Sequence, residues 1–306
     1  MTKEIITSVS DIIKLASTKS HYGSNQWWFR GQPDKEYKLQ PGLFRPENGK
    51  FYNENKLISE FIRIHPKAQE KHSDIIELLT YAQHYGLPTR LLDWTENALV
   101  ALFFACRDKP NKDGKVFFLP SYIEEVDFFD FYNFGFGNHF IRKLIELNAI
   151  EDFEGLLESE IDDLDRRYKD IVVKQLYVSD MSFFDYKKQK MANHFHILHE
   201  PVDIKYLTSG SSYSTHAGFM YKPKKINKRL VAQQGCFTCH TGKIIDGIPV
   251  VNTNDIFERI AYSFDVPQEN KENIMNELKY CGIYEATLFP ELDYQTKYIK
   301  SIGLDN

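Results

Sequence analysis

Residues 96–107 read Glu-Asn-Ala-Leu-Val-Ala-Leu-Phe-Phe-Ala-Cys-Arg, and this stretch decides the fold. Every residue from Ala98 to Cys106 is apolar, so a helix formed here has no polar face to turn toward water. A helix of that kind must be covered by other elements on all sides. We therefore predict a buried helix at the centre of the core, with the rest of the chain packed around it.

The segments around this helix predict both strands and further helices. Residues 25–32 (NQWWFRGQ) are rich in aromatic residues and are typical of a buried strand. A second strand is expected at 115–119, and short β-like runs recur between 171 and 263. Capped segments with apolar residues at helical spacing occur at 5–17, 53–65, 73–86 and 268–280. The pattern predicts the α+β class, with mixed small β-sheets around the buried central helix.

Composition narrows the class of protein. The chain has 306 residues without an internal repeat or low-complexity linker, so we expect a single domain spanning 1–306. The formal net charge of −5 argues against broad nucleic-acid binding. No stretch approaches the roughly 18 apolar residues of a membrane helix, and the N-terminus lacks the pattern of a secretory signal. With only four cysteines, too few for a disulfide scaffold, we expect a cytoplasmic protein with no membrane partner.

Residues 236–240 spell Cys-x-x-Cys-His, the pattern of c-type haem attachment. That attachment requires export, for which this chain shows no signal, so we predict no haem. Cys236 and Cys239 are interpreted as small strand residues, with a redox or zinc role as the alternative. The neighbouring Gln233 and Gln234 are then better targets for mutation than the cysteines.

Two further clusters have ordinary interpretations. His194 and His196 have a spacing that suits zinc, but no nearby residue obviously completes the ligand set, so no metal is expected. The basic run from Lys222 to Arg229 is interpreted as a solvated loop rather than a nucleic-acid contact.

Arg30 lies within a strand that otherwise has the composition of core. A buried guanidinium must find an acceptor, and its planar fork suits a carboxylate or a phosphate. The alternative is an internal ion pair with Asp93. Gly31, which follows, would allow a ligand or another backbone to approach closely, and Gln32 ends the segment.

Residues 81–95 hold the densest group of polar side chains among apolar ones. His84 is placed at the last turn of a helix, where it could act as an acid, a base or a hydrogen-bond donor. Asp93 or Thr95 could cap the buried helix, whose N-terminal amides would favour an anion. The alternative is that Arg90 and Asp93 pair with one another. The other candidates for ligand contacts in this segment are Gln83, Tyr85, Thr89, Arg90 and Trp94.

The chain resembles the FRG-domain family in four strings. These are FRG at 29–31, LQPGLFRP at 39–46, AQHYGLPTRLLDWTENALVALFFA at 82–105 and GIYEATLFPELD at 282–293. They occur in the family's order across most of the chain, and the longest is the most specific. Residues of about 121–225 are less recognisable and are interpreted as an insertion. The resemblance implies a bacterial or phage protein that acts in a conflict or defence setting.

The order of elements is also similar to that of ADP-ribosyltransferase-like folds, which place an Arg-Gly early, a Ser/Thr-rich segment in the middle and a carboxylate late. Here these would be Arg30, residues 208–215 and Glu285. The similarity implies that NAD is the substrate of an ADP-ribosyltransferase or NAD glycohydrolase, with Arg30, His84, Asp93 and Glu285 as catalytic candidates. The expected partners are a nucleotide-like small molecule and a macromolecular acceptor. A non-catalytic sensor module is the alternative, and a nuclease the third.

Overall fold

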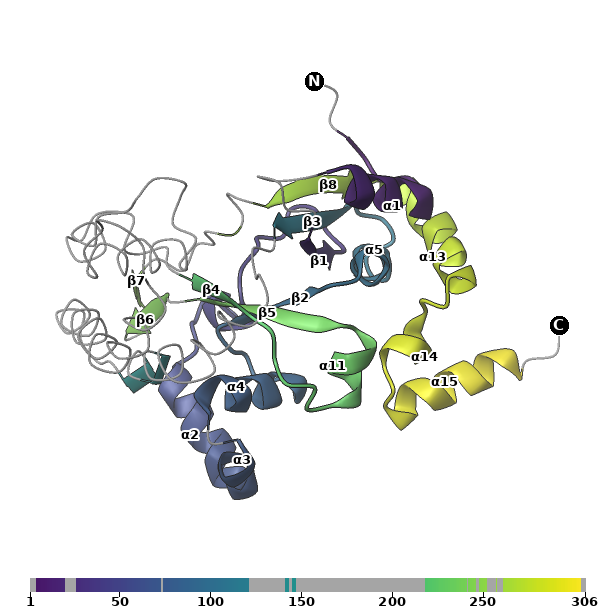
Figure 1. Ribbon diagram of the computed structural model, residues 1–306. Helices are drawn as coiled ribbons and strands as arrows, with labels where there is room; N and C mark the ends of the chain where they lie inside the picture. The colour runs from purple at the N-terminus through teal and green to yellow at the C-terminus, as the bar shows by residue number, and fades with distance from the viewer. Residues whose placement is uncertain are drawn as a thin grey trace, which may run out of the picture.

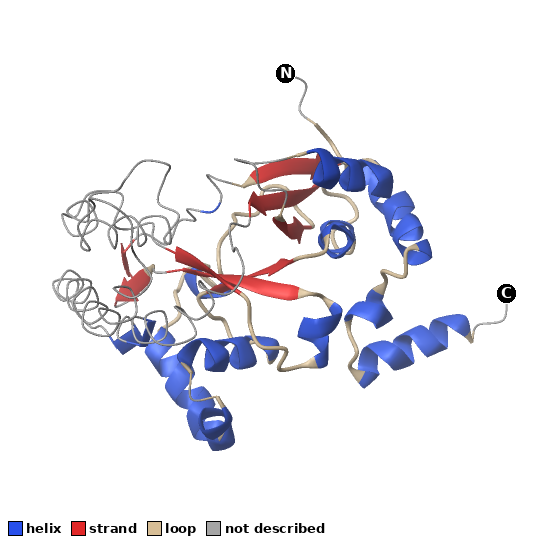
Figure 2. Cartoon of the chain, viewed as in Figure 1, coloured by secondary structure: helices blue, strands red, loops and turns tan. Residues whose placement is uncertain are grey.

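The fold is seen in a computed structural model, which describes residues 4–19, 26–72, 74–120, 218–240, 242–245, 248–251 and 261–303, together with residues 141, 142, 145, 146 and 257. Within these residues, strands and helices form an α+β fold, which confirms the class expected from the sequence (Figures 1 and 2). Instead of several small sheets, most strands join one six-stranded antiparallel sheet in the order β4-β5-β2-β1-β3-β8, and β6 and β7 form a separate pair. The strands are β1 (Trp27–Gln32), β2 (Leu91–Thr95), β3 (Gly114–Pro120), β4 (Gly218–Tyr221), β5 (Gly235–His240), β6 (Lys243–Ile245), β7 (Ile248–Val251) and β8 (Tyr262–Val266).

Helices cover both faces of the large sheet. In Figure 1, α1, α5 and α13 lie beside the β1-β3-β8 half, and α2, α3 and α4 lie beneath the β2-β5-β4 half. The described helices are α1 (Val9–Thr18), η1 (Gly42–Phe44), α2 (Glu54–Ile64), α3 (Pro66–Lys71), α4 (Ile75–His84), α5 (Ala98–Cys106), α11 (Lys228–Ala232), η3 (Gln268–Asn270), α13 (Lys271–Tyr280), α14 (Glu285–Leu288) and α15 (Leu292–Ile302).

Helix α5 is buried in the core, as its sequence predicts. Its small residues Ala101 and Ala105 face the sheet at two glycines, and all four residues lie in direct backbone contact. A Cβ atom placed on Gly31 of β1 would stand 1.8 Å from the Ala101 carbonyl oxygen, and one on Gly114 of β3 would stand 2.5 Å from that of Ala105. The helix backbone therefore approaches β1 and β3 more closely than any side chain at these positions would allow.

Alternation along β1 divides its side chains between two hydrophobic clusters. Trp27 and Phe29 point toward α5 and the cluster that it shares with α1 and α13, whereas Trp28 points to the cluster formed with α2, α3 and α4. Gly31 has the same parity as Trp27 and Phe29, and Arg30 the same parity as Trp28. The register thus places Gly31 against α5 and directs Arg30 to the opposite face.

The sheet is paired unevenly at its centre. Strand β1 pairs with β3 over its whole length, but its pairing with β2 is limited to Phe29 opposite Thr95. Strand β2 in turn pairs with β5 from Leu91 to Thr95. The sheet is therefore split between β1 and β2 beyond Thr95, on the side where Arg30 and Asp93 lie.

Several local expectations are corrected by the structure. The N-cap of α5 is Asn97, whose side chain accepts from the Leu99 amide at 3.0 Å. Asp93 and Thr95 belong to strand β2 rather than to a helix cap, because this short segment pairs with β5. The helix predicted at 73–86 is α4, and its N-cap is Asp74, one residue beyond the predicted start. Residues 228–232 form helix α11, where the sequence predicted the end of a basic loop followed by a β-like run.

We predict that replacing Gly31 with alanine destabilises the fold by about 3 kcal/mol or more, because the new methyl group would overlap the Ala101 carbonyl of α5. Urea unfolding of the two proteins measures this difference. Gly42→Ala is the matched control. Its added Cβ would meet only Pro88, at 3.7 Å, so its stability should lie within about 0.5 kcal/mol of the parent. Equal stability of the Gly31→Ala protein and the parent would contradict the packing described.

Candidate functional site

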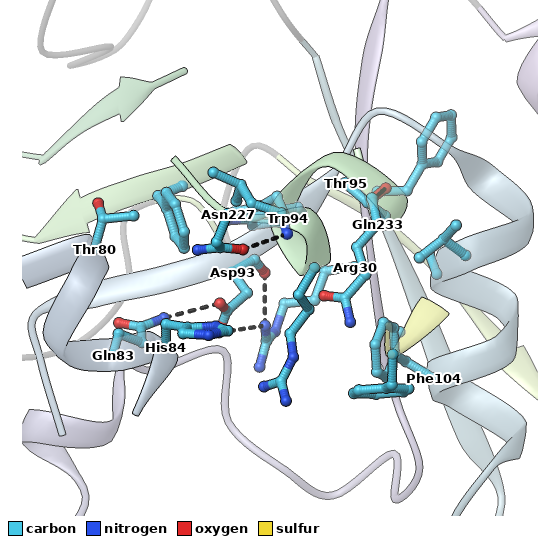
Figure 3. A pocket seen from close by; sticks show the side chains of 18 of the residues that line it. Arg30, Thr80, Gln83, His84, Asp93, Trp94, Thr95, Phe104, Asn227 and Gln233 are labelled. Carbon is cyan, nitrogen blue, oxygen red and sulfur yellow. Dashed lines mark hydrogen bonds and ion pairs between the residues drawn. The ribbon is translucent and has the colours of Figure 1, made fainter. Parts of the chain in front are cut away.

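A cavity of about 390 Å³ opens where β1 and β2 separate. Its walls come from β1, β2, β5, the end of α4, one side of α5, α11 with its cap, and the residue that follows α14 (Figure 3). The volume falls in the lower part of the roughly 300–1,000 Å³ range of small-molecule sites. The polar and aromatic residues of this lining include Arg30, Gln83, His84, Asp93, Trp94, Phe104, Arg107, Asn227, Arg229, Gln233 and Phe289.

Arg30 and Asp93 meet at the split in the sheet. The Nη1 group of Arg30 donates to the main-chain carbonyl of Asp93 at 2.6 Å, and lies 4.0 Å from the carboxylate. Because β1 no longer pairs with β2 here, the guanidinium supplies the hydrogen bond that a neighbouring strand would otherwise give to this carbonyl. The sequence left open whether Arg30 binds a ligand or pairs with Asp93. In the structure it contacts Asp93 and also lines the cavity.

A short hydrogen-bonded chain holds the Asp93 carboxylate from the other side. The Nε2 group of Gln83 donates to Asp93 Oδ1 at 2.8 Å, and Thr89 donates its hydroxyl hydrogen to the Gln83 side-chain oxygen. Thr89 itself is buried and accepts from the Leu91 amide at 3.1 Å. The Asp93 side chain remains 66% exposed, so its carboxylate is oriented by Gln83 and still open to the cavity.

His84 closes the last turn of α4 and lines the cavity beside Gln83 (Figure 3). Burial lowers the pKa of its imidazole below the usual value. The positive charge of Arg229 lowers this pKa further, while Glu291 acts in the opposite direction. The imidazole is therefore neutral near pH 7, with a ring nitrogen able to accept a proton.

The cavity has a positive lining in an acidic chain. Arg30, Arg107 and Arg229 line it with Asp93 as the one carboxylate among the described lining residues, whereas the whole chain carries a formal charge of −5. Carboxylates outside the lining pair with two of the arginines: Glu285 with Arg107 and Glu291 with Arg229. A lining of this sign attracts an anionic ligand.

Arg90 does not reach the cavity. Its side chain is 0% exposed, and its Nε donates to Glu54 Oε1 at 2.8 Å while Nη2 contacts the second oxygen of the same carboxylate. Nη1 donates to the main-chain carbonyls of His240 and Gly242. All three nitrogens are engaged within the core, so Arg90 fixes α2 to β2 and β5. Arg90 is therefore not a ligand contact as predicted, and its partner is Glu54 rather than Asp93, which the sequence offered as the alternative.

Other predicted ligand contacts also lie away from the lining. Gln32 is buried and donates to the Lys38 carbonyl, at 3.4 Å. Tyr85 is 64% exposed and packs against Tyr81 and His84. Glu285 contacts Arg107 at 3.3 Å and Lys297 at 2.7 Å, so it acts on the cavity through Arg107. Gly31 lines the cavity only with its backbone, because its open face is filled by α5.

Strand β5 carries the Cys-x-x-Cys-His motif into the core. Burial raises the pKa of both thiols, that of Cys239 to about 12, so neither is a reactive thiolate near neutral pH. Gln233 lines the cavity and donates to the Leu288 carbonyl at 3.2 Å. Gln234 lies outside the lining, with a positive φ of 48°, and accepts from the Glu96 amide.

Metal ligands and membrane-spanning helices can be assessed only among the residues that the structure describes. Within it, no group of three or more His, Cys, Asp or Glu side chains is arranged to hold a metal ion. The segment 208–215 and the histidines at 194 and 196 lie outside the described residues. Among the helices that the structure describes, none combines the length and the apolar character needed to span a bilayer.

Four important lining residues were missed from the sequence. Arg107 ends the stretch 96–107, which was interpreted only as a buried helix, and Phe289 belongs to the string GIYEATLFPELD, of which only Glu285 was considered. Asn227 and Arg229 belong to the stretch that was interpreted as a solvated loop. Asn227 caps α11 by accepting from the Leu230 amide at 2.7 Å. The signal that could have located Arg229 is its position beside that cap.

Comparison with known families gives one match. Residues 25–114 match the FRG domain. This segment includes β1, α4, β2 and α5, and so contributes Arg30, His84 and Asp93 to the cavity. Residues from Asn227 onward complete the walls from outside the matched segment. No curated protein and no solved structure matches the chain.

We predict that Arg90→Met destabilises the protein by about 3–5 kcal/mol, because it leaves Glu54 as an unpaired buried charge. Chemical denaturation measures the effect. The double variant Arg90→Met/Glu54→Met should recover much of the loss. Arg63→Met removes an exposed pair with Glu60 and should cost less than about 1 kcal/mol. A single Arg90→Met variant as stable as the parent would show that the buried pair does not support the fold.

We predict that His240 makes the fold sensitive to acid. Burial lowers the pKa of this imidazole to about 3, with Arg90 and Arg30 acting in the same direction. Below about pH 6.5 the unfolded chain takes up a proton that the folded chain excludes, so the free energy of unfolding falls as pH decreases from about 6.5 toward 3. Denaturation at several pH values should show a weaker pH dependence in His240→Gln. The same slope in both proteins would contradict this account.

Proposed function

We propose that the cavity of this chain, which carries a match to the FRG domain at residues 25–114, binds a phosphate-bearing nucleotide, with NAD as the first candidate. We propose further that the protein either transfers the ADP-ribosyl group to an acceptor or hydrolyses NAD. One observation carries this proposal. A cavity of small-molecule size joins three arginines to an oriented but accessible carboxylate, Asp93.

The residue types suit the bond that would break. In NAD the bond between the nicotinamide nitrogen and ribose C1′ breaks, nicotinamide leaves with the electron pair, and positive charge develops on the ribose. A carboxylate beside the ribose stabilises that charge. Asp93 is the carboxylate for this role, because it lines the cavity and its orientation is fixed by Gln83. Glu285 is engaged by Arg107 and Lys297 outside the lining.

His84 supplies the second half of the chemistry. Water or the nucleophile of an acceptor forms the new bond at C1′ and must lose a proton. His84 lines the same cavity as Asp93, and its lowered pKa keeps the imidazole unprotonated near neutral pH. It is therefore suited to take up this proton as a general base. Phe104, which is half-buried, offers aromatic surface to a base or to the nicotinamide ring, whereas Trp94 is buried and donates its indole N–H to the Thr238 hydroxyl.

The setting follows from the resemblance rather than from the geometry. We propose a cytoplasmic effector used in conflict between bacteria and phages, with a macromolecule as the acceptor of any transfer. The cavity supplies the small-molecule half of this proposal, and the acceptor would approach from its open side.

A non-catalytic nucleotide sensor is the second candidate. The observation in its favour is a continuous chain of contacts formed by Arg30, Asp93, Gln83 and Thr89. A ligand that bound Arg30 would compete with the Asp93 carbonyl and alter this chain, which links β1 to β2 and α4. In that case nucleotide would raise the melting temperature without being consumed.

We predict that the purified full-length chain releases nicotinamide from NAD, and that Asp93→Asn lowers the rate at least about a hundredfold by removing the charge that stabilises the ribose cation. Chromatographic quantification of nicotinamide measures the rate, and labelled NAD in cell lysate detects transfer. His84→Gln should lower the rate by about 10²–10⁴. Arg63→Gln, on the exposed face of α2, is the control and should leave the rate unchanged.

Three outcomes separate the candidates. Release or transfer that depends on Asp93 supports the enzyme. Thermal stabilisation by NAD with no release and no transfer leaves the sensor. No stabilisation, no release and no transfer would exclude NAD as the ligand of this cavity.

A further inference from the structure

We propose that Arg107 and Arg229 form the phosphate subsite of this cavity and that Phe289, from the C-terminal segment, positions both. This inference rests on the proposed function in that it names the group by which the ligand is recognised. It assigns recognition of the ligand's phosphate to residues outside the Arg30 motif. Of these, Arg229 and Phe289 lie beyond the matched segment 25–114.

Both guanidinium groups lie against the same aromatic ring. The Cζ atom of Arg107 is 4.7 Å from the centroid of Phe289, and that of Arg229 is 5.2 Å from it. The two Cζ atoms are therefore no more than about 10 Å apart. Cation–π contacts of this kind orient a guanidinium without using its N–H donors. Two like charges held this close are stabilised by an anion placed between them.

Arg229 keeps most of its donors available. Its Nε donates to Glu291 Oε1 at 2.8 Å, and no described residue accepts a hydrogen bond from its Nη groups. Glu291 engages it through one oxygen, since the other carboxylate oxygen has no hydrogen-bond partner among the described residues. The outer edge of the guanidinium, with its parallel N–H bonds, is therefore open to the planar, bidentate contact that arginine makes with phosphate.

Arg107 is held in a similar way from α5. Its Nη2 lies 3.3 Å from Glu285 Oε1, and its Nε lies 3.9 Å from Asp108 Oδ1. These ion pairs are looser than a bidentate one, and the side chain is 26% exposed at the cavity. The Glu285 carboxylate also pairs with Lys297, at 2.7 Å through its other oxygen, so its negative charge is shared between Lys297 and Arg107. Arg30 differs from both arginines, because its Nη1 is bound to the Asp93 carbonyl.

Phe289 is fixed by its own neighbours. Its ring stacks on Tyr294 at 4.6 Å and meets Phe104 of α5 edge-on at 6.1 Å. The 285–291 segment thus supplies the ring that both arginines contact and a carboxylate for each of them. Phe289 is a positioning residue, which acts on the anion through Arg107 and Arg229. Inorganic pyrophosphate carries the phosphate groups of a dinucleotide without its base or sugar, and it therefore probes this subsite alone.

The test is isothermal titration of the full chain with inorganic pyrophosphate, ADP-ribose and NAD. Arg107→Gln and Arg229→Gln should each weaken pyrophosphate binding at least about tenfold, as expected for loss of a charge-assisted hydrogen-bonded contact. Arg229→Lys keeps the charge but not the fork, and should still weaken binding. Arg63→Gln removes an exposed arginine paired with Glu60 and should bind as the parent does.

The positioning role of Phe289 has its own readout. Phe289→Leu should weaken pyrophosphate binding several-fold, and Phe289→Tyr, which restores an aromatic face, should recover it. Melting temperatures of the two variants show whether either change acts through the fold. Binding that is equally weak in both, or unchanged in both, would overturn this role.

The outcomes separate the two proposals. Pyrophosphate binding that depends on Arg107 and Arg229, without binding of ADP-ribose or NAD, would retain the subsite and reject the nucleotide. Nucleotide and pyrophosphate binding that is unchanged in Arg107→Gln, Arg229→Gln and Arg229→Lys would overturn the subsite and retain the nucleotide. No binding of any of the three compounds would overturn both.

Discussion

The structure depends on the backbone contact between α5 and the centre of the sheet. Gly31 and Gly114 leave no side chain between the helix and strands β1 and β3, and Ala101 and Ala105 present small residues to them. A helix with no polar face can be buried at this depth, because the sheet and helices cover most of its surface and the remainder lines the cavity. The FRG motif is thus explained first by packing, since its glycine permits the approach.

The same contact determines where the cavity forms. When Gly31 faces α5, strand alternation turns Arg30 to the opposite face, where α4 ends. Strand β1 then follows β3 along its length and leaves β2 after a single pair, so a space remains between two strands of one sheet. Arg30 spans this space to the Asp93 carbonyl, and α5 supplies Phe104 and Arg107 from the side. Packing and site are therefore consequences of one register.

The features that could be predicted from the sequence are those that depend on residues close together in the chain. The buried helix at 98–106, the strand around Arg30 and the position of His84 at a helix end follow from local periodicity and stop signals, and all are confirmed. The partner of Arg90 could not be found in this way, because Glu54 lies 36 residues away on another helix. The same holds for Arg229 and Phe289, which reach the cavity only through tertiary packing against residues 25–114. From the sequence alone, the basic stretch that contains Arg229 is interpreted as solvated, because its contacts with Glu291 and Phe289 form only in the folded chain.

The central claim is that the split between β1 and β2 is a nucleotide site with its phosphate end at Arg107 and Arg229. A crystal structure of the full chain with ADP-ribose tests this most directly. The account predicts phosphate oxygens within hydrogen-bond distance of both guanidinium groups and the ribose beside Asp93. ADP-ribose bound elsewhere on the protein, with the space between β1 and β2 unoccupied at saturating concentration, would contradict it.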